Sequence, residues 1–227
     1  MSIILSIETS SKNCSVSLSK DGILISNIEE NSESFSHANN LHFFCEKIIN
    51  KANLNLSDVD AYAFSEGPGS YTGLRIGAAA VKGFAFSFDK PVISISTLKA
   101  MAYAHKHKND FLCPVIDSRK GEVYLAIYDS SMKVVLEPQS YVISQNSIDK
   151  LIQKNRISFF GTGIEKLKKN ISHKNAFFIE GIFPSSKYLI ELAQESYLNK
   201  NFVDISNFEP RVYSLLFSMM FPRESAC

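Results

Sequence analysis

The stretch Phe64-Ser-Glu-Gly-Pro-Gly-Ser-Tyr-Thr-Gly-Leu-Arg-Ile-Gly77 does most to decide the fold of this chain. A short apolar run breaks into a loop of closely spaced glycines and then opens a helical pattern, an order that turns backbone amides toward an anion. Gly67 and Gly69 free the backbone, and Ser70 or Thr72 can cap the helix. The loop is therefore a candidate phosphate contact, and the alternative is a tight strand-to-helix turn.

Neither standard phosphate motif is present in this loop. No lysine follows the glycines as in a P-loop, and Thr72 stands where a dinucleotide-binding fingerprint has its third glycine. The spacing alone therefore leaves both interpretations open.

The composition is that of an ordinary globular protein, with 227 residues, 45% of them hydrophobic and 21% charged. The net charge of +1 gives no overall field that would attract nucleic acid. The four cysteines are far apart, which favours reduced thiols over a zinc site or a disulfide framework. Without a basic start or an uninterrupted apolar run of about 18 residues, we expect a cytoplasmic protein with no membrane span.

Two parts of the chain follow the same order of elements, which predicts a duplicated mixed α/β architecture with a cleft between the halves. Residues 1–108 form the first half with a linking helix, 109–213 the second half, and 214–227 a tail. Strands are expected at 3–7, 15–19, 23–28, 61–65 and 92–95, and again at 111–116, 122–128, 134–143, 157–160 and 176–179. Helices are expected at 41–52, 72–88, 96–108, 147–154 and 186–199, with another opening at 161–163.

Each half also ends its first strand with an acid, Glu8 or Asp117, followed by a hydroxyl residue. In a cleft, the two carboxylates can hold a metal ion through water while the glycine loops receive phosphates. The alternative is that they cap neighbouring amides or pair with Arg119 or Arg75. The candidate nucleotide or phosphate contacts are Glu8, Thr9, Gly67, Gly69, Ser70, Asp117, Arg119, Gly161 and Gly163.

Three segments resemble the TsaB (YeaZ) family: Ile4-Leu-Ser-Ile-Glu-Thr-Ser-Ser11, the run from Gly67 to Gly77, and Asp117-Ser-Arg119 followed by Gly-Glu-Val-Tyr124. The resemblance covers most of the chain. It implies the actin-like ATPase fold with duplicated ribonuclease-H-like halves. It also implies a role in forming N6-threonylcarbamoyladenosine at position 37 of tRNAs that read codons beginning with A. The family member is a non-catalytic partner of a larger catalytic paralogue, TsaD, and an ATPase, TsaE, joins them.

The chain departs from the family pattern in two places. Glu8 stands where aspartate is usual and Ser118 where alanine is common, and the longer Glu8 side chain would displace a bound metal by roughly one methylene. Residues 208–213 only loosely resemble the closing segment of the family, and residues 214–227 match nothing in it. The apolar cluster in this tail predicts either a packed end helix or an exposed apolar patch.

No catalytic or metal-ligating residue is predicted. The five histidines include no pair one helical turn apart, the arrangement that the resemblance implies for the metal site of the paralogue. Neither His-Glu-x-x-His nor Gly-x-Ser-x-Gly occurs. A scaffold subunit is therefore favoured, with an actin-like ATP-dependent kinase or ATPase and then a peptidase as alternatives. We expect no intrinsic cofactor, ATP or ADP and Mg²⁺ only at the boundary of the complex, and tRNA only through the complex.

A partner surface is predicted on the helix that follows the glycine loop. Gly73, Gly77, Ala80 and Phe84 share one stripe by three- and four-residue spacing, and their small side chains predict a groove for a second helix. Phe43, on the opposite face of the neighbouring helix, is also assigned to the partner interface, and Phe43→Asp is the second probe of it. The resemblance implies pairing with the paralogue in this region and a homodimer in isolation, so that Gly77→Leu blocks both associations. The alternative is burial of the stripe against the sheet of the same chain.

Overall fold

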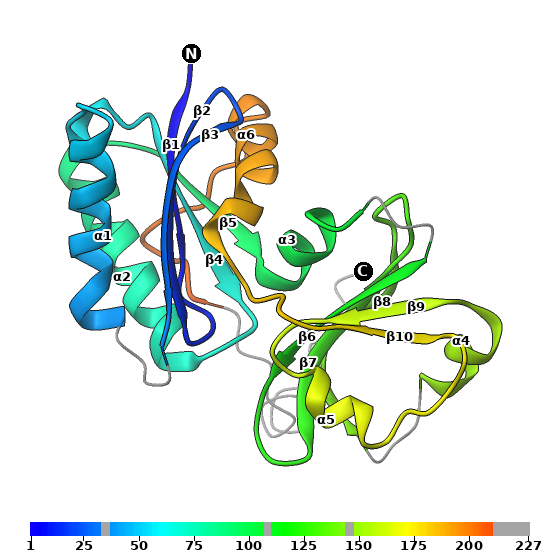
Figure 1. Ribbon diagram of the computed structural model, residues 1–227. Coiled ribbons are helices and arrows are strands. Elements are labelled where there is room, and N and C mark those ends of the chain that lie inside the picture. The colour runs from blue at the N-terminus through cyan, green and yellow to red at the C-terminus, as the bar shows by residue number, and fades with distance from the viewer. Residues whose placement is uncertain (33–36, 107–109, 144–147, 211–227) are drawn as a thin grey trace.

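The computed structural model describes residues 1–32, 37–106, 110–143 and 148–210, which form two lobes that each contain a mixed five-stranded sheet (Figure 1). The predicted tail, 214–227, lies outside the described residues. The first sheet contains β1 (Ile3–Glu8), β2 (Asn13–Lys20), β3 (Ile23–Asn31), β4 (Ala61–Gly67) and β5 (Val92–Ser96). The second contains β6 (Phe111–Asp117), β7 (Glu122–Tyr128), β8 (Val134–Val142), β9 (Ile157–Phe160) and β10 (Ala176–Ile179).

The two sheets have the same topology. The first runs β3-β2-β1-β4-β5 and the second, read from its other edge, runs β8-β7-β6-β9-β10. In each, the first strand pairs antiparallel with the second and parallel with the fourth. All ten predicted strands are present. The predicted duplicated, actin-like fold with helices flanking mixed sheets is confirmed.

The helices differ in length between the halves. They are α1 (His37–Lys51), α2 (Tyr71–Phe88), α3 (Thr97–Tyr103), α4 (Asp149–Lys154), α5 (Ile164–Lys168) and α6 (Ile190–Leu198), with 3₁₀ turns η1 (Leu56–Asp58) and η3 (Ser186–Leu189). The predicted helix over 96–108 is shorter, and the one over 186–199 divides into η3 and α6. Within the described ranges, no helix is both long and apolar enough to cross a membrane.

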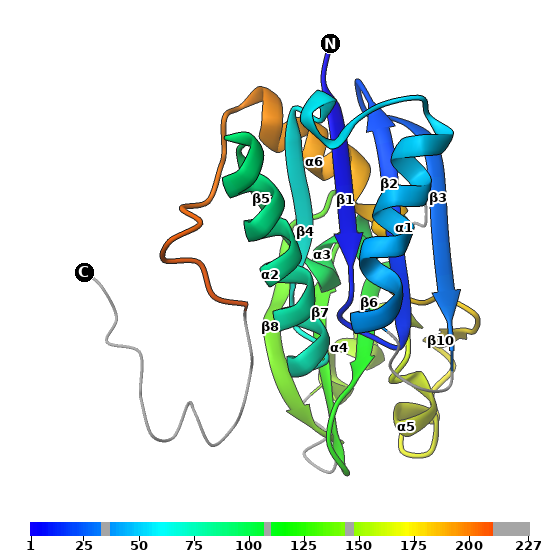
Figure 2. The ribbon, with the colours of Figure 1, turned by 90° about the vertical axis from the view of Figure 1, so that its left-hand side faces the viewer.

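Side chains alternate across the first sheet, as the pleat requires. Leu5 and Ile7 belong to the core that α1 and α2 cover, whereas Ile4 faces the opposite side, where it packs with α6. Thus α1 and α2 cover one face of the first sheet and η3 with α6 the other (Figures 1 and 2). The helix α3 lies between the two sheets and contacts β4, β5 and β6.

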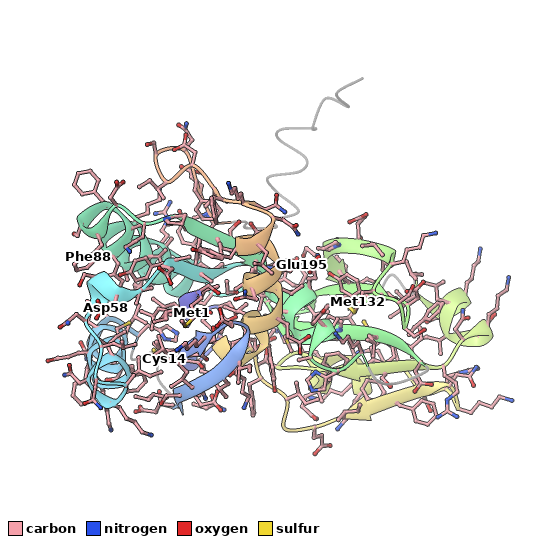
Figure 3. The ribbon with its side chains drawn as sticks, turned by 90° about the horizontal axis from the view of Figure 1, so that it is seen from above. Met1, Cys14, Asp58, Phe88, Met132 and Glu195 are labelled. Carbon is pink, nitrogen blue, oxygen red and sulfur yellow. The ribbon has the colours of Figure 1, made fainter. Side chains whose placement is uncertain are left out.

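The returning segment η3–α6 lies late in the sequence but packs against the first sheet. Figure 3 shows α6, which carries Glu195, on the side of the first lobe that faces the second. Leu189, Leu192 and Ala193 of this segment pack in an apolar cluster on the first sheet. Polar contacts add to it: the Ser186 hydroxyl lies 2.7 Å from the Ser15 hydroxyl, and the Ser186 amide donates to the same Ser15 oxygen at 3.1 Å. Burial disfavours ionisation of Glu29, but hydrogen bonds from Ser185 and Lys187 outweigh it and lower the Glu29 pKa. The two lobes are therefore connected by this return of the chain to the first sheet as well as by α3.

Candidate binding cleft between the two halves

A cleft of about 850 Å³ opens where the carboxyl ends of β1 and β6 approach the glycine loop. Parallel strands of open α/β sheets place binding sites at this edge. Four predicted contacts, Gly69, Ser70, Asp117 and Arg119, line the cleft. The lining from both halves also includes Ser10, Ser11, Lys12, Tyr71, Ser118, Tyr124, Thr162 and Phe183. The other predicted contacts, Glu8, Thr9, Gly67, Gly161 and Gly163, do not line it.

Glu8 is buried rather than directed into the cleft. Its side chain is 1% exposed, and one carboxylate oxygen accepts a hydrogen bond from the Ser10 amide at 2.6 Å. Burial raises the pKa of Glu8, and hydrogen bonds from Ser10, Ser65 and Thr9 oppose that rise. The structure therefore places this acid at the end of β1, as the predicted cap of an amide in the turn that follows.

The loop that contains Gly67 and Gly69 packs directly against the turn that follows β1. The Ser70 amide donates to the Ser10 carbonyl at 2.6 Å, and a Cβ on Gly69 would lie 2.3 Å from the same oxygen. Gly67 has a φ of +107°, which a side chain would disfavour. The predicted Ser70 cap is present, because its hydroxyl accepts from the Gly73 amide at 3.2 Å. These contacts favour the alternative interpretation, a tight strand-to-helix turn.

The prediction that Gly73 and Gly77 line an open groove on α2 is wrong. A Cβ on Gly73 would lie 2.1 Å from the Thr9 carbonyl oxygen, and one on Gly77 would lie 2.4 Å from the Thr9 hydroxyl. Both glycines and Ala80 are buried within the chain. A leucine at Gly77 would therefore collide with Thr9, and it cannot serve as a clean probe of association. The stripe follows the alternative interpretation, burial inside this domain.

The other predicted surface residues divide between core and solvent. The Phe84 ring stacks on the Tyr62 ring with centroids 5.5 Å apart and is half-buried. Phe43 is 56% exposed, with the Lys47 ammonium 5.8 Å from its ring centroid. Sequence reasoning missed the solvent-facing stripe of α2, which consists of Thr72, Arg75, Ala79, Gly83 and Phe86. The signal was available, because Ala79 and Gly83 are also small and four residues apart.

Asp117, the matching acid of the second half, lies at the surface of the cleft. Its side chain is 53% exposed, and the Lys166 ammonium lies 2.6 Å from one carboxylate oxygen. The same ammonium donates to the carbonyls of Arg119 at 2.7 Å and Ser118 at 3.1 Å. The Asp117 amide donates to the Thr162 hydroxyl at 2.9 Å. The predicted pairing of this carboxylate exists, but its partner is Lys166 rather than Arg119 or Arg75.

The second glycine loop repeats the packing role of the first. A Cβ on Gly161 would lie 2.2 Å from the Val115 carbonyl oxygen, and the Gly161 φ is +119°. The Gly163 amide donates to the same oxygen at 3.1 Å. Both Gly-x-Gly loops therefore approach the backbone closely near the carboxyl end of the first strand of their half, the first loop at the turn after β1 and the second at β6 itself.

The lining of the cleft fits a polar, anionic molecule better than a metal ion. Lys12 and Arg119 supply positive charge, hydroxyls supply donors, and Tyr71, Tyr124 and Phe183 supply apolar faces. The two acids do not form a donor set for Mg²⁺. Glu8 is buried outside the cleft, and the Asp117 carboxylate forms an ion pair with the Lys166 ammonium. Among the described residues, no three His, Cys, Asp or Glu side chains are grouped to hold a metal.

Comparison with known proteins agrees with this architecture. The family model described as TsaD, tRNA N6-adenosine threonylcarbamoyltransferase, matches residues 24–182. A curated protein of Haemophilus influenzae named tRNA threonylcarbamoyladenosine biosynthesis protein TsaB is 32% identical over 224 residues, 91% of each chain. A curated tRNA N6-adenosine threonylcarbamoyltransferase of Staphylococcus haemolyticus is 33% identical over 129 residues, 50% of this chain and 38% of that protein.

The structural match is to the YeaZ fold. A crystal structure from Pseudomonas aeruginosa, described as an uncharacterized protein with similarity to peptidase YEAZ, matches with a TM-score of 0.81 and 26% identity. The match covers 93% of this chain and 99% of that chain. With full-length similarity in sequence and in fold, this chain belongs to the TsaB (YeaZ) family.

Proposed function

We propose that this protein is a non-catalytic scaffold or activating subunit of the complex that forms N6-threonylcarbamoyladenosine at position 37 of tRNAs that read codons beginning with A. It acts in the cytoplasm, supports a TsaD-like catalytic paralogue and a TsaE-like ATPase, and meets tRNA only through the complex. The proposal takes its pathway from the names of the curated relatives.

The observation that carries the non-catalytic role is the state of the two acids. An actin-like ATPase needs carboxylates that converge on a metal-bound nucleotide. Here Glu8 is buried beneath the glycine loop, and Asp117 is neutralised by Lys166. In this proposal the protein has no intrinsic cofactor, and ATP or ADP with Mg²⁺ binds at the boundary with the partner subunits.

The partner surface in this proposal is the exposed side of α1 and α2. It combines Phe43 with the α2 stripe of Thr72, Arg75, Ala79, Gly83 and Phe86. Large aromatic side chains left in solvent beside small residues are typical of a surface that another helix covers. The same face serves a homodimer in isolation and a heterodimer with the catalytic subunit, so the two associations are mutually exclusive.

The test is genetic depletion of this protein in its host, followed by mass spectrometry of tRNA nucleosides. We expect N6-threonylcarbamoyladenosine to disappear and to return with the wild-type chain and with a Glu8→Gln, Asp117→Asn double variant. Ala79→Arg, which blocks the proposed surface, is expected not to restore it. Gln153→Arg on the exposed side of α4 is the matched control and is expected to restore it.

Three outcomes count against the proposal. If the modified nucleoside persists after depletion, the proposed role of this protein in forming it is wrong. A folded double-acid variant that fails to restore the modification favours the ATPase or kinase alternative. Rescue by Ala79→Arg with normal co-purification of the catalytic subunit moves the partner surface elsewhere.

A further inference from the structure

The cleft between the two halves presents hydroxyl groups that can donate to an anion. The hydroxyls of Ser11, Ser70 and Thr162 each accept a hydrogen bond from a backbone amide, at 3.2, 3.2 and 2.9 Å respectively. A hydroxyl that accepts such a bond keeps its own proton to donate. All three residues line the cleft, two from the first half and one from the second. The cleft therefore offers O–H donors from both of its walls.

Positive side chains stand on both sides of the same cleft. Lys12 in the first half and Arg119 in the second line it, and both are exposed. Asp117 also lines the cleft, and the Lys166 ammonium lies 2.6 Å from its carboxylate. Because that carboxylate is already paired, the charges that face the cleft favour an anion.

Two aromatic rings in the lining are partly open to solvent. Tyr71, at the start of α2, is 49% exposed, and Phe183, in the segment that returns to the first lobe, is 39% exposed. The Arg75 guanidinium lies 4.0 Å from the Tyr71 ring centroid and adds positive charge beside the cleft. Exposed rings within a basic groove are the surfaces on which unpaired nucleobases stack.

The backbone of the two glycine loops is less suited to a polyphosphate. The Ser70 amide donates to the Ser10 carbonyl at 2.6 Å, and the Gly163 amide donates to the Val115 carbonyl at 3.1 Å. A nucleoside triphosphate needs such amides, together with a metal ion, to meet its several negative charges. A phosphodiester carries one negative charge per nucleotide, which hydroxyls and separate cations can satisfy. The cleft therefore matches a nucleic-acid strand better than a free triphosphate.

We propose that the cleft binds an unpaired stretch of RNA, with bases stacked on Tyr71 and Phe183 and phosphodiesters against Lys12 and Arg119. The identification of this RNA as a loop of the tRNA rests on the proposed function. Two phosphate contacts give the isolated chain weak binding without selectivity for tRNA. This agrees with a subunit that meets tRNA only through the complex and then helps to hold an unpaired loop.

The test is an NMR titration of the ¹⁵N-labelled full-length chain with a single-stranded RNA hexamer of adenosines. We expect the amides of Ser11, Tyr71 and Thr162 to shift together as the hexamer is added. ATP with Mg²⁺ and a short RNA duplex, titrated separately, should each bind at least about tenfold more weakly. The logarithm of the affinity should fall against the logarithm of salt concentration with a slope of about −1.4, which corresponds to two neutralised phosphates on a single strand.

Variants of the cations test the phosphate contacts. Lys12→Gln and Arg119→Gln should each reduce the salt slope to about −0.7, because one phosphate contact is lost. Lys154→Gln, at an exposed position on α4, is the matched control and should leave the slope unchanged. The spectrum of each variant shows directly whether it is folded.

A variant of an aromatic ring tests the stacking. Phe183→Ala should weaken binding of the hexamer by about tenfold. Phe177→Ala is the matched control, because the Phe177 ring on β10 is 37% exposed but does not line the cleft. It should leave the affinity unchanged.

Four results would overturn RNA binding in the cleft. They are the absence of shifts at millimolar hexamer, shifts confined to residues outside the cleft, binding of ATP as tight as that of the hexamer, and equal losses in the cleft and control variants. The proposed function is decided separately by the depletion experiment. Loss of the modified nucleoside without hexamer binding leaves that function standing and removes the RNA site, whereas hexamer binding with persistent modified nucleoside does the reverse.

Discussion

The two halves share one strand order but differ in what covers the end of their first strand. In the first half, an α2 of 18 residues and its glycine loop close over β1 and bury Glu8. In the second half, an α5 of only 5 residues follows the matching loop, and Asp117 stays half-exposed. The duplicated sheet therefore fixes where each acid lies, whereas the helix that follows the glycine loop determines whether that acid is buried or exposed.

The glycine loops are the part of the repeat that both halves keep. Each brings its backbone against a carbonyl near the carboxyl end of the first strand of its half, that of Ser10 in the turn after β1 and that of Val115 within β6. Close backbone approach needs a residue without Cβ. The loop shared by the two halves therefore has a packing role. The two acids differ, and in the proposal above neither is available to hold a metal ion in the cleft.

The largest effect is expected when this approach is blocked. Gly69→Ala in the first half and Gly161→Ala in the second each force a Cβ onto a backbone carbonyl, at 2.3 Å and 2.2 Å respectively. We expect each to lower the free energy of unfolding by about 2–3 kcal/mol. Gly83→Ala is the control, because its Cβ points into open space and it should gain up to about 1 kcal/mol. Urea unfolding measures all three.

A result that breaks the symmetry would be informative. If Gly69→Ala is costly and Gly161→Ala is neutral, the second loop relaxes and the shared packing role applies to one half only. If both are neutral, the close approach is not what stabilises these loops.

Much of this architecture could be predicted from the sequence because its causes are local. Alternating and apolar runs predicted the strands, and the repeated order of these elements predicted that the two halves are duplicated. The burial of Glu8 could not be predicted, since spacing places an acid at a strand end without showing what closes over it. The docking of η3 and α6 on the first sheet was missed for a similar reason, because it depends on contacts between distant residues, such as Leu192 with the first sheet and Ser15 with Ser186, 171 residues apart.

The partner stripe on α2 shows the same limit. Gly73, Gly77 and Ala80 share a face by spacing, and so do Ala79 and Gly83. Periodicity identifies both stripes but cannot say which faces the sheet of the same chain. Only the contact between Thr9 and the first two glycines decides it.

An intermediate effect is expected from neutralising the buried acid. The pKa of Glu8 is raised in the folded chain, so the folded state binds this proton more tightly than the unfolded state does. Its contribution to stability is therefore present at low pH and lost as the pH rises from the unfolded pKa through the folded one. Glu8→Gln keeps an acceptor for the Ser10 amide and should be more stable than wild type at pH 7, by roughly 1 kcal/mol.

Urea unfolding of both proteins between pH 4 and pH 8 measures this difference. The gain should shrink toward acidic pH, where wild-type Glu8 is protonated as well. Asp117→Asn, which removes the half-exposed acid at the matching position of the second half, is the control. A Glu8→Gln gain that is constant across the range would mean that the carboxyl is not the source.

The smallest effect on stability is expected at the ion pair of the second half. Asp117 is half-exposed, and an exposed pair contributes at most about 1 kcal/mol, so Lys166→Met should change the free energy of unfolding by less than that. Its local effect should be larger, because the same ammonium also donates to the carbonyls of Ser118 and Arg119. Without those bonds, residues 118–122 should open more often, and hydrogen exchange of their amides should rise by about tenfold. Lys168→Met on the same helix is the matched control, since Lys168 pairs with Glu165 and Glu180 and not with this loop. Faster exchange in Lys166→Met alone would show that a side chain of α5 holds the second loop in place, where the first half uses backbone packing under α2. Equal exchange in both lysine variants would remove that contrast between the halves.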